Sequence, residues 1–507
     1  MHTMVRTARP LVDGDASSVD NRGLPLTPDQ APIEASAGSG SRLRPWMIAC
    51  AGFVFAVSIL AAETLDRRLS TDVFWQMEAG QWMLAHHTVI GLDPFSYTET
   101  HRHWVADEWG SEVILASLYK VFGAAAYNII AIVTGALSVG ATMLYARTLG
   151  AKGARLASIA VVVGLALIPF VTQDRGLSFS LILLPVELLI LIKARTSPAW
   201  LWSLPVLCLV WVNLHGSVFI GLCVLAAELA WSWAPARAIV RLDGVGQSSH
   251  RRWLAMALVS STLATGITPY GPRLMVYDVH LILNPNFGQY IAEFQSPDFH
   301  SIAMYLLFLP ALGIMFLAFR QRTHFVLEST LTAVFFLAAL HSVRVIPYLV
   351  IAAAGLAATL PAGRRPWGER ARLITGAVGI GLMVVVVAIP SVPAGSVSTD
   401  TPIQAFNYLA THPGRVFTQY EWADYSIARH RATFVDGRND LFMGTVLNDY
   451  FAVSQLKTDP DPIFTKWDVA YVVWARSTPL AEYLDHDPRW HVVDRTPQAL
   501  IFGRTAS

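Results

Sequence analysis

Charged residues are scarce in this sequence. Asp, Glu, Lys and Arg make up 14% of the 507 residues, whereas 54% are hydrophobic. So few charges cannot cover the surface of a water-soluble protein of this length. The formal net charge is only +1, and nucleic-acid binding needs a concentrated basic face. The composition therefore excludes a water-soluble globular protein and argues against a nucleic-acid partner.

Cysteine is also rare. The three cysteines, Cys50, Cys208 and Cys223, lie inside apolar stretches and show neither disulfide nor metal-ligand spacing. The sequence contains no recognisable Ser-His-Asp arrangement, no glycine-rich phosphate-binding loop and no His/Cys metal cluster. We therefore expect no NTP-driven pump and no nucleotide cofactor.

Long apolar runs are what the sequence has in abundance. Because about 20 residues cross the hydrocarbon core of a bilayer, we predict about eleven spans. They lie at residues 46–63, 124–147, 154–172, 177–193, 199–214, 216–233, 253–270, 301–320, 324–341, 345–361 and 373–392. The mean hydropathy of +0.45 agrees with a polytopic α-helical membrane protein.

Short basic loops predict the orientation of these spans. If the chain starts inside, the basic residues of five loops fall on one side: Arg147, Lys152 and Arg155; Lys193 and Arg195; Arg237, Arg241, Arg251 and Arg252; Arg320 and Arg322; and Arg364, Arg365, Arg370 and Arg372. Short loops rich in Lys and Arg stay cytoplasmic. We therefore expect a cytoplasmic N-terminus, an extracytoplasmic C-terminus and, at residues 1–44, a disordered cytoplasmic tail.

The composition changes after the last predicted span, which divides the chain into a membrane domain at residues 45–392 and an outer domain at residues 393–507. In the outer domain short apolar runs alternate with polar, helix-like pieces. Helices are predicted at Thr401–Thr411 and Pro479–Leu484, and strands at Arg415–Gln419, Ala432–Val435, Val469–Trp474 and Ala499–Phe502. This pattern predicts a small C-terminal extracytoplasmic α/β domain.

Two predicted outer segments, Thr64–Lys120 and Gly271–His300, are too long to be simple connections, and long loops are commonly functional. Residues 70–86 and the segment beginning at 103–112 each predict an amphipathic helix in the first of them. Trp is favoured at the depth of the lipid headgroups, so these helices are expected to lie in the membrane interface. They carry three carboxylates to the outer surface: Asp72, Asp107 and Glu108.

Several short motifs of the outer segments occur in a particular order: Asp72–Gln76, Asp93–Thr98, Asp107–Trp109, Trp211–Gly216, Thr268–Gly271, Glu293–Pro297, Arg344–Pro347 and Phe434–Arg438. Their order and outer placement resemble those of bacterial membrane glycosyltransferases of the GT-C superfamily, over most of residues 45–507. The resemblance is to polyprenyl-phosphate-sugar dependent enzymes of the mannosyltransferase and arabinosyltransferase type. It implies a GT-C-like helical fold.

The resemblance also implies a function. Such enzymes transfer a sugar from a polyprenyl-phosphate carrier to a glycan, lipid or protein acceptor at the outer face of the bacterial inner membrane, usually with inversion at the anomeric carbon. The reaction needs a carboxylate that accepts the proton of the acceptor hydroxyl. It also needs cationic groups that bind the leaving phosphate, and a groove that admits the lipid chain.

The resemblance places the catalytic carboxylate just beyond the first span, so Asp72 is the expected base. A helix N-cap is the alternative role for this residue. Asp107 and Glu108 are expected as a second acid or as metal ligands, although acidic residues at a helix start also stabilise the helix dipole. A divalent cation could bind Asp72 and Glu108, and the sequence leaves its requirement open.

Three Arg residues at predicted outer span ends are candidates for phosphate binding: Arg175, Arg273 and Arg344. Guanidinium groups form bidentate hydrogen bonds with phosphate, but they also snorkel to lipid headgroups. His215, at a tight outer turn, could orient a hydroxyl or a carboxylate, or serve the turn alone. The matching motifs add three substrate-binding candidates: Gln76, Tyr270 and Glu293.

Other polar residues allow two interpretations. Two uses are open for seven residues of the outer domain, which could contact sugars or form its core and turns: Tyr420, Trp422, Tyr425, Asp436, Arg438, Asp440 and Tyr450. In the second interpretation Asp436 and Arg438 pair to fix a turn after a strand. Ionisable groups are costly inside a membrane. We expect those of the apolar spans, Glu187 and Glu328, to pair with basic loop residues.

Two other classes of function stay open. A transporter or flippase of a lipid-linked sugar would share the groove and the basic contacts, but transporters commonly show internal repeats with broken helices at the bilayer midplane. We find no convincing repeat, and the acidic residues gather at the outer surface. A non-catalytic envelope assembly protein is the other alternative. Sugar transfer by Asp72 and Glu108 variants would distinguish these classes.

Overall fold

A computed structural model describes residues 44–66, 72–172, 176–233, 247–284, 291–321, 326–361 and 400–505. The predicted tail up to residue 43, the predicted span at 373–392 and the predicted domain boundary at 392/393 lie outside the described residues.

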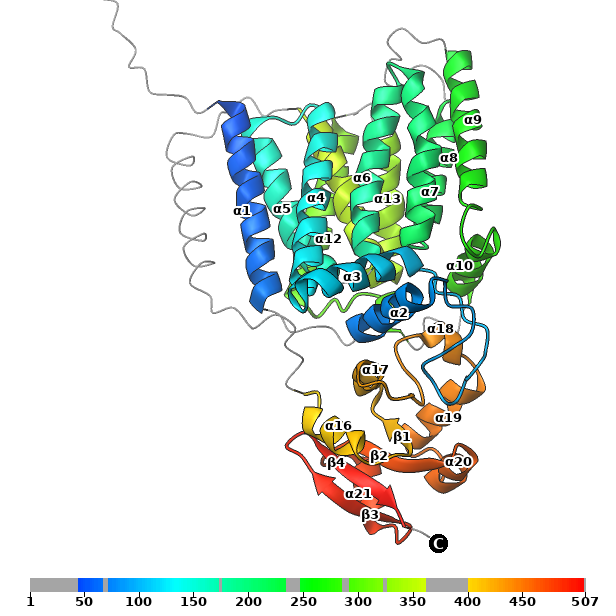
Figure 1. Ribbon diagram of the computed structural model, residues 1–507. Helices are drawn as coiled ribbons and strands as arrows, with labels where there is room; N and C mark the ends of the chain where they lie inside the picture. The colour runs from blue at the N-terminus through cyan, green and yellow to red at the C-terminus, as the bar shows by residue number, and fades with distance from the viewer. Residues whose placement is uncertain are drawn as a thin grey trace, which may run out of the picture. The chain divides into compact units, whose positions relative to one another are not determined.

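Long apolar helices dominate the first part of the described chain (Figure 1). Five of them are long and apolar enough to cross a membrane: α1 (Pro45–Asp66), α4 (Ala125–Thr148), α5 (Gly153–Val171), α6 (Leu177–Ala194) and α12 (Ile302–Arg320). Shorter apolar helices follow the same pattern: η2 (Pro198–Ser203) with α7 (Leu204–Leu214), α8 (Val218–Trp231), α13 (Val326–His341), and η4 (Val343–Val345) with α14 (Ile346–Thr359). These nine segments agree closely with predicted spans.

The seventh predicted span, 253–270, overlaps α9 (Gln247–Ala264), which contains polar residues in its first turns and ends at Ala264. The structure therefore supports a polytopic membrane protein without establishing a count of eleven spans. The outward side of α12 agrees with contact to lipid, because Ile302, Leu306 and Phe319 are 76%, 69% and 83% exposed. A helix that is apolar all round is typical of a membrane span.

Two amphipathic helices lie across the ends of the spans instead of among them (Figure 1). They are α2 (Asp72–His86) and α3 (Trp109–Phe122), and both occur where the sequence predicted them. Phe74 and Met77 of α2 pack with Leu115 of α3. α3 also packs against α4 and α7. The connection from α2 to α3 is thereby held at the ends of the spans.

The segment between α9 and α12 contains α10 (Arg273–Leu283) and the single turn η3 (Ala292–Phe294). α10 starts directly after Pro272, whose fixed φ suits a helix start. The short turn η4 follows Ser342, which lies at the end of α13. Backbone and side-chain contacts join η3 to η4: the Val343 N–H donates to the Gln295 carbonyl at 3.0 Å, and Ser342 Oγ donates to the Glu293 carbonyl at 2.9 Å.

The C-terminal part is an α/β domain built on a four-stranded sheet. Its strands are β1 (Arg415–Thr418), β2 (Val469–Ala475), β3 (Trp490–Arg495) and β4 (Ala499–Arg504), in the order β1-β2-β4-β3. β1 pairs with β2 in parallel, and the other two pairs are antiparallel. Its helices are α16 (Ile403–Ala410), α17 (Tyr420–Ala428), α18 (Asn439–Phe442), α19 (Thr445–Ser454), α20 (Pro460–Lys466) and α21 (Pro479–His486).

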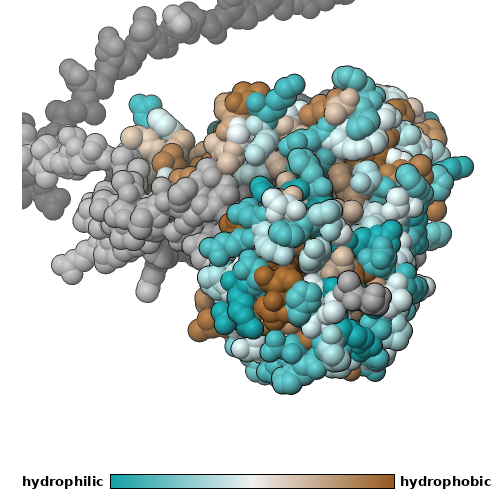
Figure 2. Space-filling view, turned by 60° about the horizontal axis from the view of Figure 1, so that its bottom comes forward, coloured by the Kyte–Doolittle hydropathy of each residue, from teal (hydrophilic) through white to brown (hydrophobic). Residues whose placement is uncertain are grey.

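Alternating side chains bury both faces of this sheet. Phe417, Val472 and Phe502 contribute to one apolar cluster, whereas their neighbours Val473 and Ile501 belong to another. This is the two-residue period of a strand covered on both sides. α21 packs into the first cluster and α16 into the second. The end of the molecule seen in Figure 2 is largely hydrophilic, unlike the outward side of α12.

The structure confirms the predicted α/β character and corrects two details. Ala432–Val435 is not a strand: within it Thr433 makes an isolated bridge to Ser96 of the α2–α3 connection. β3 was missed, because His491, Asp494 and Arg495 interrupt the apolar alternation on which the prediction depends.

The sequence also predicts basic partners for two acidic residues of the spans, Glu187 and Glu328. Arg195 donates to Glu228 at 3.1 Å and lies 3.9 Å from Glu328, so the expected pairing is confirmed for Glu328. It is wrong for Glu187, whose carboxyl has no hydrogen-bond partner in the described part of the chain. One of its oxygens lies against Gly221 of α8, where it would be 2.7 Å from an added Cβ atom.

Candidate functional site

Glu108 is the centre of a buried polar cluster at the ends of the spans. Its Oε2 accepts hydrogen bonds from Gln76 Nε2 at 3.1 Å and from the Gly176 N–H at 3.3 Å. His215 Nε2 lies 3.3 Å from its Oε1. These groups come from α2, from the start of α6 and from the turn between α7 and α8. The fold therefore joins three predicted site residues: Gln76, Glu108 and His215.

The position of the Glu108 carboxyl depends on a close approach of the backbone. A Cβ atom at Gly176 would lie 2.9 Å from Glu108 Cδ and 2.8 Å from the Leu214 carbonyl oxygen, so glycine alone fits here. Gly176 precedes the first turn of α6, where N–H groups face anions favourably. Glu108 itself precedes α3, but its side chain makes no capping bond with that helix.

His215 has contacts at both ring nitrogens. The Ser217 backbone N–H donates to Nδ1 at 3.1 Å, and the Ser180 and Ser217 hydroxyls lie 3.0 and 2.7 Å from Nδ1. Nε2 lies 3.3 Å from Glu108 Oε1 and 3.2 Å from Arg344 Nη2, which can only donate. These contacts fix the orientation of the ring.

Arg344 is the cation of the cluster. Its Nη2 lies 3.2 Å from His215 Nε2, and its Nη1 lies 3.7 Å from Glu293 Oε2. The guanidinium also stacks over the Phe294 ring at 5.1 Å. His215 Nε2 therefore contacts both the Arg344 guanidinium and the Glu108 carboxyl. Arg344 and Glu293 are therefore both brought to the site, as predicted.

Asp278 of α10 joins the cluster from another direction. Its carboxyl is 3% exposed and lies against Gly216, where a Cβ atom would be 2.8 Å from Asp278 Cγ. Gly216 follows His215, so the turn presents the histidine and makes room for Asp278 at once. Burial raises the pKa of Asp278 to about 7, with a further upward effect from Glu108 and an opposing effect from Arg344.

Burial and mutual repulsion act on the other carboxyls as well. Burial raises the pKa of Glu108, while Arg344 and the Gly176 N–H oppose that increase. Burial raises the pKa of Asp107 well above its usual range, and Asp278, Glu108 and Asp440 raise it further. Perturbed pKa values of this kind cluster at functional sites.

The C-terminal domain contributes to the same region. Asp440 of α18 accepts a hydrogen bond from the Tyr277 hydroxyl of α10. Burial raises the pKa of Asp440, whereas the Tyr277 hydrogen bond opposes that increase. Asp440 in turn helps to raise the pKa of Asp107. The outer domain thus faces the acidic cluster directly.

Asp72 is the first residue of α2 and is half-buried. Its Oδ1 and the Trp75 indole face Gly437 of the C-terminal domain, where they would be 3.0 and 2.7 Å from an added Cβ atom. Residues four apart lie on one face of a helix, so Asp72 is one turn from Gln76, the partner of Glu108. The structure places Asp72 beside the cluster, and its catalytic role stays a prediction.

The remaining candidates lie elsewhere. Arg175 is outside the described residues. Arg273 is exposed, and no contact given for the described residues joins it to Glu108. The Tyr270 hydroxyl donates to the Ile90 carbonyl at 2.6 Å and accepts from the Ala106 N–H at 3.1 Å. Tyr270 thereby fixes the connection that carries Asp107 and Glu108.

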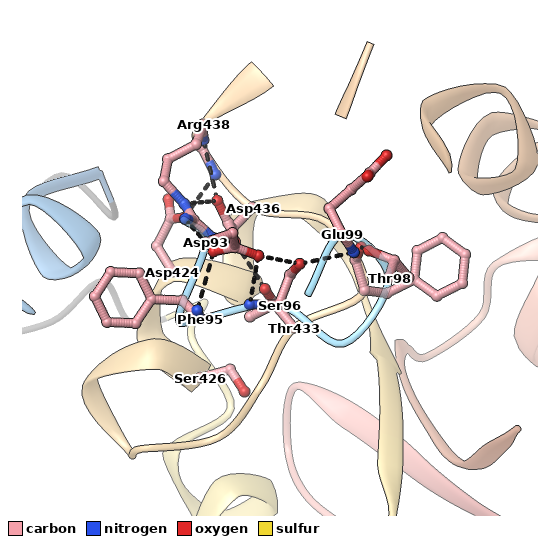
Figure 3. A network of polar contacts seen from close by, with 12 residues as sticks. Asp93, Phe95, Ser96, Thr98, Glu99, Asp424, Ser426, Thr433, Asp436 and Arg438 are labelled. Carbon is pink, nitrogen blue, oxygen red and sulfur yellow. Dashed lines mark hydrogen bonds and ion pairs between the residues drawn. The ribbon is translucent and has the colours of Figure 1, made fainter. Parts of the chain in front are cut away.

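A buried ion cluster joins the α2–α3 connection to the C-terminal domain (Figure 3). Arg438 donates to Asp436 through Nε at 2.8 Å and Nη2 at 2.7 Å, and to Asp93 through Nη1 at 2.6 Å. Its guanidinium lies 4.7 Å from the Trp104 ring centroid. The side chains of all three ionic residues are fully buried. The predicted pairing of Asp436 with Arg438 is confirmed, and we call the trio the Arg438 clasp.

Hydrogen bonds around the Arg438 clasp fix the same junction. Asp93 accepts from the Phe95 N–H at 3.0 Å and the Ser96 N–H at 3.1 Å, which closes a tight turn. Thr98 Oγ1 donates to the Phe434 carbonyl at 2.6 Å. Two motifs of the sequence, Asp93–Thr98 and Phe434–Arg438, therefore form one structural unit. Trp422 and Tyr425 pack in apolar clusters of the domain, which agrees with their structural interpretation.

Several residues of the acidic cluster had not been predicted. They are Ser180, Ser217, Tyr277, Asp278 and the buried Glu112 of α3, whereas Asp440 was among the outer-domain residues considered for sugar contact. None belongs to a motif with distinctive spacing, and α10 and α18 reach the cluster only through long-range packing. The available signal was polar residues within the second long outer segment. Across the described ranges, no group of three or more His, Cys, Asp or Glu is arranged to hold a metal ion.

One prediction follows from the pKa of Asp278. That pKa is about 7 in the folded protein instead of the ordinary 3.8, a difference that corresponds to about 4 kcal/mol. Because the folded-state pKa is raised, the folded state loses stability as the pH rises from about 4 to about 7. Asn does not titrate, so Asp278→Asn does not lose stability in this pH range for this reason. Thermal unfolding in detergent should therefore show the variant gaining stability relative to the unaltered protein between pH 5 and pH 8; an equal difference at both values would contradict the assignment.

No protein-family model and no curated protein sequence matches the chain. Solved structures do match. The oligosaccharyltransferase AglB from Archaeoglobus fulgidus, in complex with an inhibitory peptide and a dolichol-phosphate, is 12% identical with a TM-score of 0.62, over 86% of this chain and 70% of its own.

ArnT from Cupriavidus metallidurans bound to undecaprenyl phosphate is 16% identical with a TM-score of 0.52, over 91% of this chain and 98% of its own. Its apo form is 18% identical with a TM-score of 0.51, over 90% and 97% of the two chains. At these identities the likeness shows that the chain shares the fold of these structures and no more.

Proposed function

We propose that this protein is a membrane glycosyltransferase that transfers a sugar from a polyprenyl-phosphate-linked donor to a glycan, lipid or protein acceptor. One observation carries the proposal: a buried cluster of carboxylates with one Arg and one His lies at the span ends, beside two interfacial helices, in a fold shared with structures that bind dolichol-phosphate and undecaprenyl phosphate. The distribution of basic loops supports an outer location of the cluster, and the membrane in this proposal is a bacterial inner membrane.

The proposed reaction forms one bond and breaks one bond. The acceptor hydroxyl oxygen attacks the anomeric carbon while the bond from that carbon to the phosphate oxygen breaks. The electron pair of the broken bond goes to the phosphate, and the hydroxyl proton goes to a base. Attack opposite the leaving phosphate inverts the anomeric configuration, which NMR of the product can test.

Three residues have distinct roles in this proposal. Asp72 is the base, since it is half-buried at the edge of the cluster, where an acceptor hydroxyl can approach. Arg344 binds the leaving phosphate, because its guanidinium is 30% exposed and its nearest carboxylate lies at 3.7 Å. Glu108 stabilises the positive charge that develops on the sugar ring at the transition state. A divalent cation could assist the departure of the phosphate. No step of the proposed reaction depends on it.

The first test is sugar transfer by the purified protein in lipid, with a panel of polyprenyl-phosphate sugars. Asp72→Asn should lower kcat by about 10²–10⁴-fold, the usual contribution of a general base, while donor binding persists. Asp298→Asn is the matched control. It removes the same charge, but from a side chain that is 73% exposed.

Two results would count against this assignment. If Asp72→Asn transfers sugar at the rate of the control, Asp72 is not the base. If neither protein transfers any sugar but both move the lipid-linked sugar across the bilayer, the flippase alternative is favoured. Binding of donor without transfer or movement would favour an assembly protein.

A further inference from the structure

Asp278 differs from Glu108 in its hydrogen-bond partners, as does Glu112, whose two carboxyl oxygens also lack a partner among the described residues. Glu108 has Gln76, Gly176 and His215 as partners, but neither Asp278 oxygen accepts a hydrogen bond in the part of the chain described. The side chain is 3% exposed, so bulk solvent does not compensate. A buried carboxyl without any donor is costly and uncommon, and it calls for a reason.

The surroundings determine which ligand groups could satisfy Asp278. The carboxyl lies against Gly216, and His215, the next residue, contacts Glu108 and Arg344. Asp278, Glu108 and Asp107 influence one another electrostatically, so another anion here would be repelled. A neutral ligand with hydroxyl donors has no such penalty. Two adjacent hydroxyls of a sugar ring offer two donors that match the two oxygens of one carboxylate.

The neighbouring Arg344 indicates that the ligand of Asp278 is the donor sugar. Resting on the proposed function, Arg344 binds the phosphate of the donor, and the donor sugar is bonded directly to that phosphate. Asp278 lies against Gly216, and the preceding residue, His215, lies 3.2 Å from Arg344 Nη2, so Asp278 and Arg344 border the same turn. A sugar whose phosphate contacts Arg344 therefore has ring hydroxyls within reach of Asp278.

We propose that Asp278 is a binding residue for the donor sugar, whose two adjacent ring hydroxyls donate hydrogen bonds to its two carboxylate oxygens. Asp278 thereby selects donors that carry both hydroxyls. Gly216 is needed for this arrangement, because any side chain there would displace the carboxyl.

The test pairs protein variants with donor analogues that each lack one ring hydroxyl. For the unaltered protein, removing either of two adjacent hydroxyls should lower kcat/KM by about 10- to 100-fold, since each hydrogen bond to a charged group is lost. In Asp278→Asn and in Asp278→Ser, the intact donor should lose a similar factor. The penalty for the same two deoxy donors should then fall to about 3-fold or less. Asp298→Asn, with its exposed side chain, should keep the full penalty.

A binding measurement separates this inference from the proposed function. Polyprenyl phosphate and polyprenyl-phosphate sugar are titrated into the unaltered protein, Asp278→Asn and Asp278→Ser in lipid. The sugar should increase affinity in the unaltered protein and in neither Asp278 variant, whether or not transfer occurs. Absence of transfer with this sugar-dependent affinity intact would overturn the proposed function alone. An unchanged deoxy penalty, or a sugar-dependent affinity that survives in a folded Asp278 variant, would overturn the role of Asp278.

Discussion

Replacing Glu108 with Gln should lower kcat for sugar transfer by about 10²–10³-fold, the cost of losing one preorganised electrostatic group. Gln has nearly the same shape and keeps an oxygen that accepts from Gly176, but it has no negative charge. His215 Nε2, 3.3 Å away, and Gln76 Nε2, at 3.1 Å, would face a neutral amide. The charge that opposes the positive sugar ring would be lost, and donor binding would change much less.

The effect of Glu108→Gln should differ in kind from that of Asp72→Asn. A base is needed only when the attacking group carries a proton that must leave. Azide carries none, so azide should restore formation of a glycosyl azide in Asp72→Asn. It should not restore transfer in Glu108→Gln, since the transition state still lacks its charge. The measurement is product formation with and without azide in both variants.

Two outcomes would contradict these roles. Rescue of Glu108→Gln by azide would make Glu108 the base. Rates within a few-fold of the unaltered protein for Glu108→Gln would show that the buried carboxylate only supports the fold. If Glu108→Gln lowers both kcat and the melting temperature, His215→Gln is the further test. It removes the ring but keeps an amide donor near Glu108.

The helices could be predicted from the sequence because the membrane imposes a simple rule. A span needs a long run without charge, and such a run is visible in the sequence itself. α4, α5 and α6 accordingly begin and end within a residue or two of the predicted ranges. β3 was missed for the opposite reason: its burial comes from packing against β4 and α21, and local sequence does not record that packing.

The candidate site was predictable only in part. Gln76, Glu108, His215 and Arg344 were found because short motifs placed them at the outer ends of predicted elements. Asp278 reaches the cluster through the position of the whole of α10, and a single Asp in an amphipathic helix has no distinguishing pattern. Arg273, on the same helix, had the expected charge and lies exposed instead. The sequence therefore indicates the residue type and its approximate depth in the membrane, but it does not indicate the direction of the side chain.

Removing the cation of the Arg438 clasp should have the largest effect on stability. Arg438→Met keeps much of the side-chain length but leaves Asp93 and Asp436 buried and uncompensated, and such a change typically costs about 3–5 kcal/mol. The contact with the Trp104 ring, 4.7 Å from the guanidinium carbon, would also lose its cationic partner. Thermal unfolding in detergent should show a marked decrease in melting temperature, whereas Arg429→Met, at an exposed position, should change it little.

The decisive comparison is with a variant that removes all three charges of the Arg438 clasp. In Arg438→Met combined with Asp93→Asn and Asp436→Asn, no unpaired charge is buried, so this triple variant should be more stable than Arg438→Met alone. If it is less stable, hydrogen bonds to the turns of Asp93 and Asp436 matter more than charge. The clasp also fixes Gly437 against Asp72. Sugar transfer should therefore fall in Arg438→Met even at temperatures where the protein stays folded, because the proposed base has lost the surface that positions it.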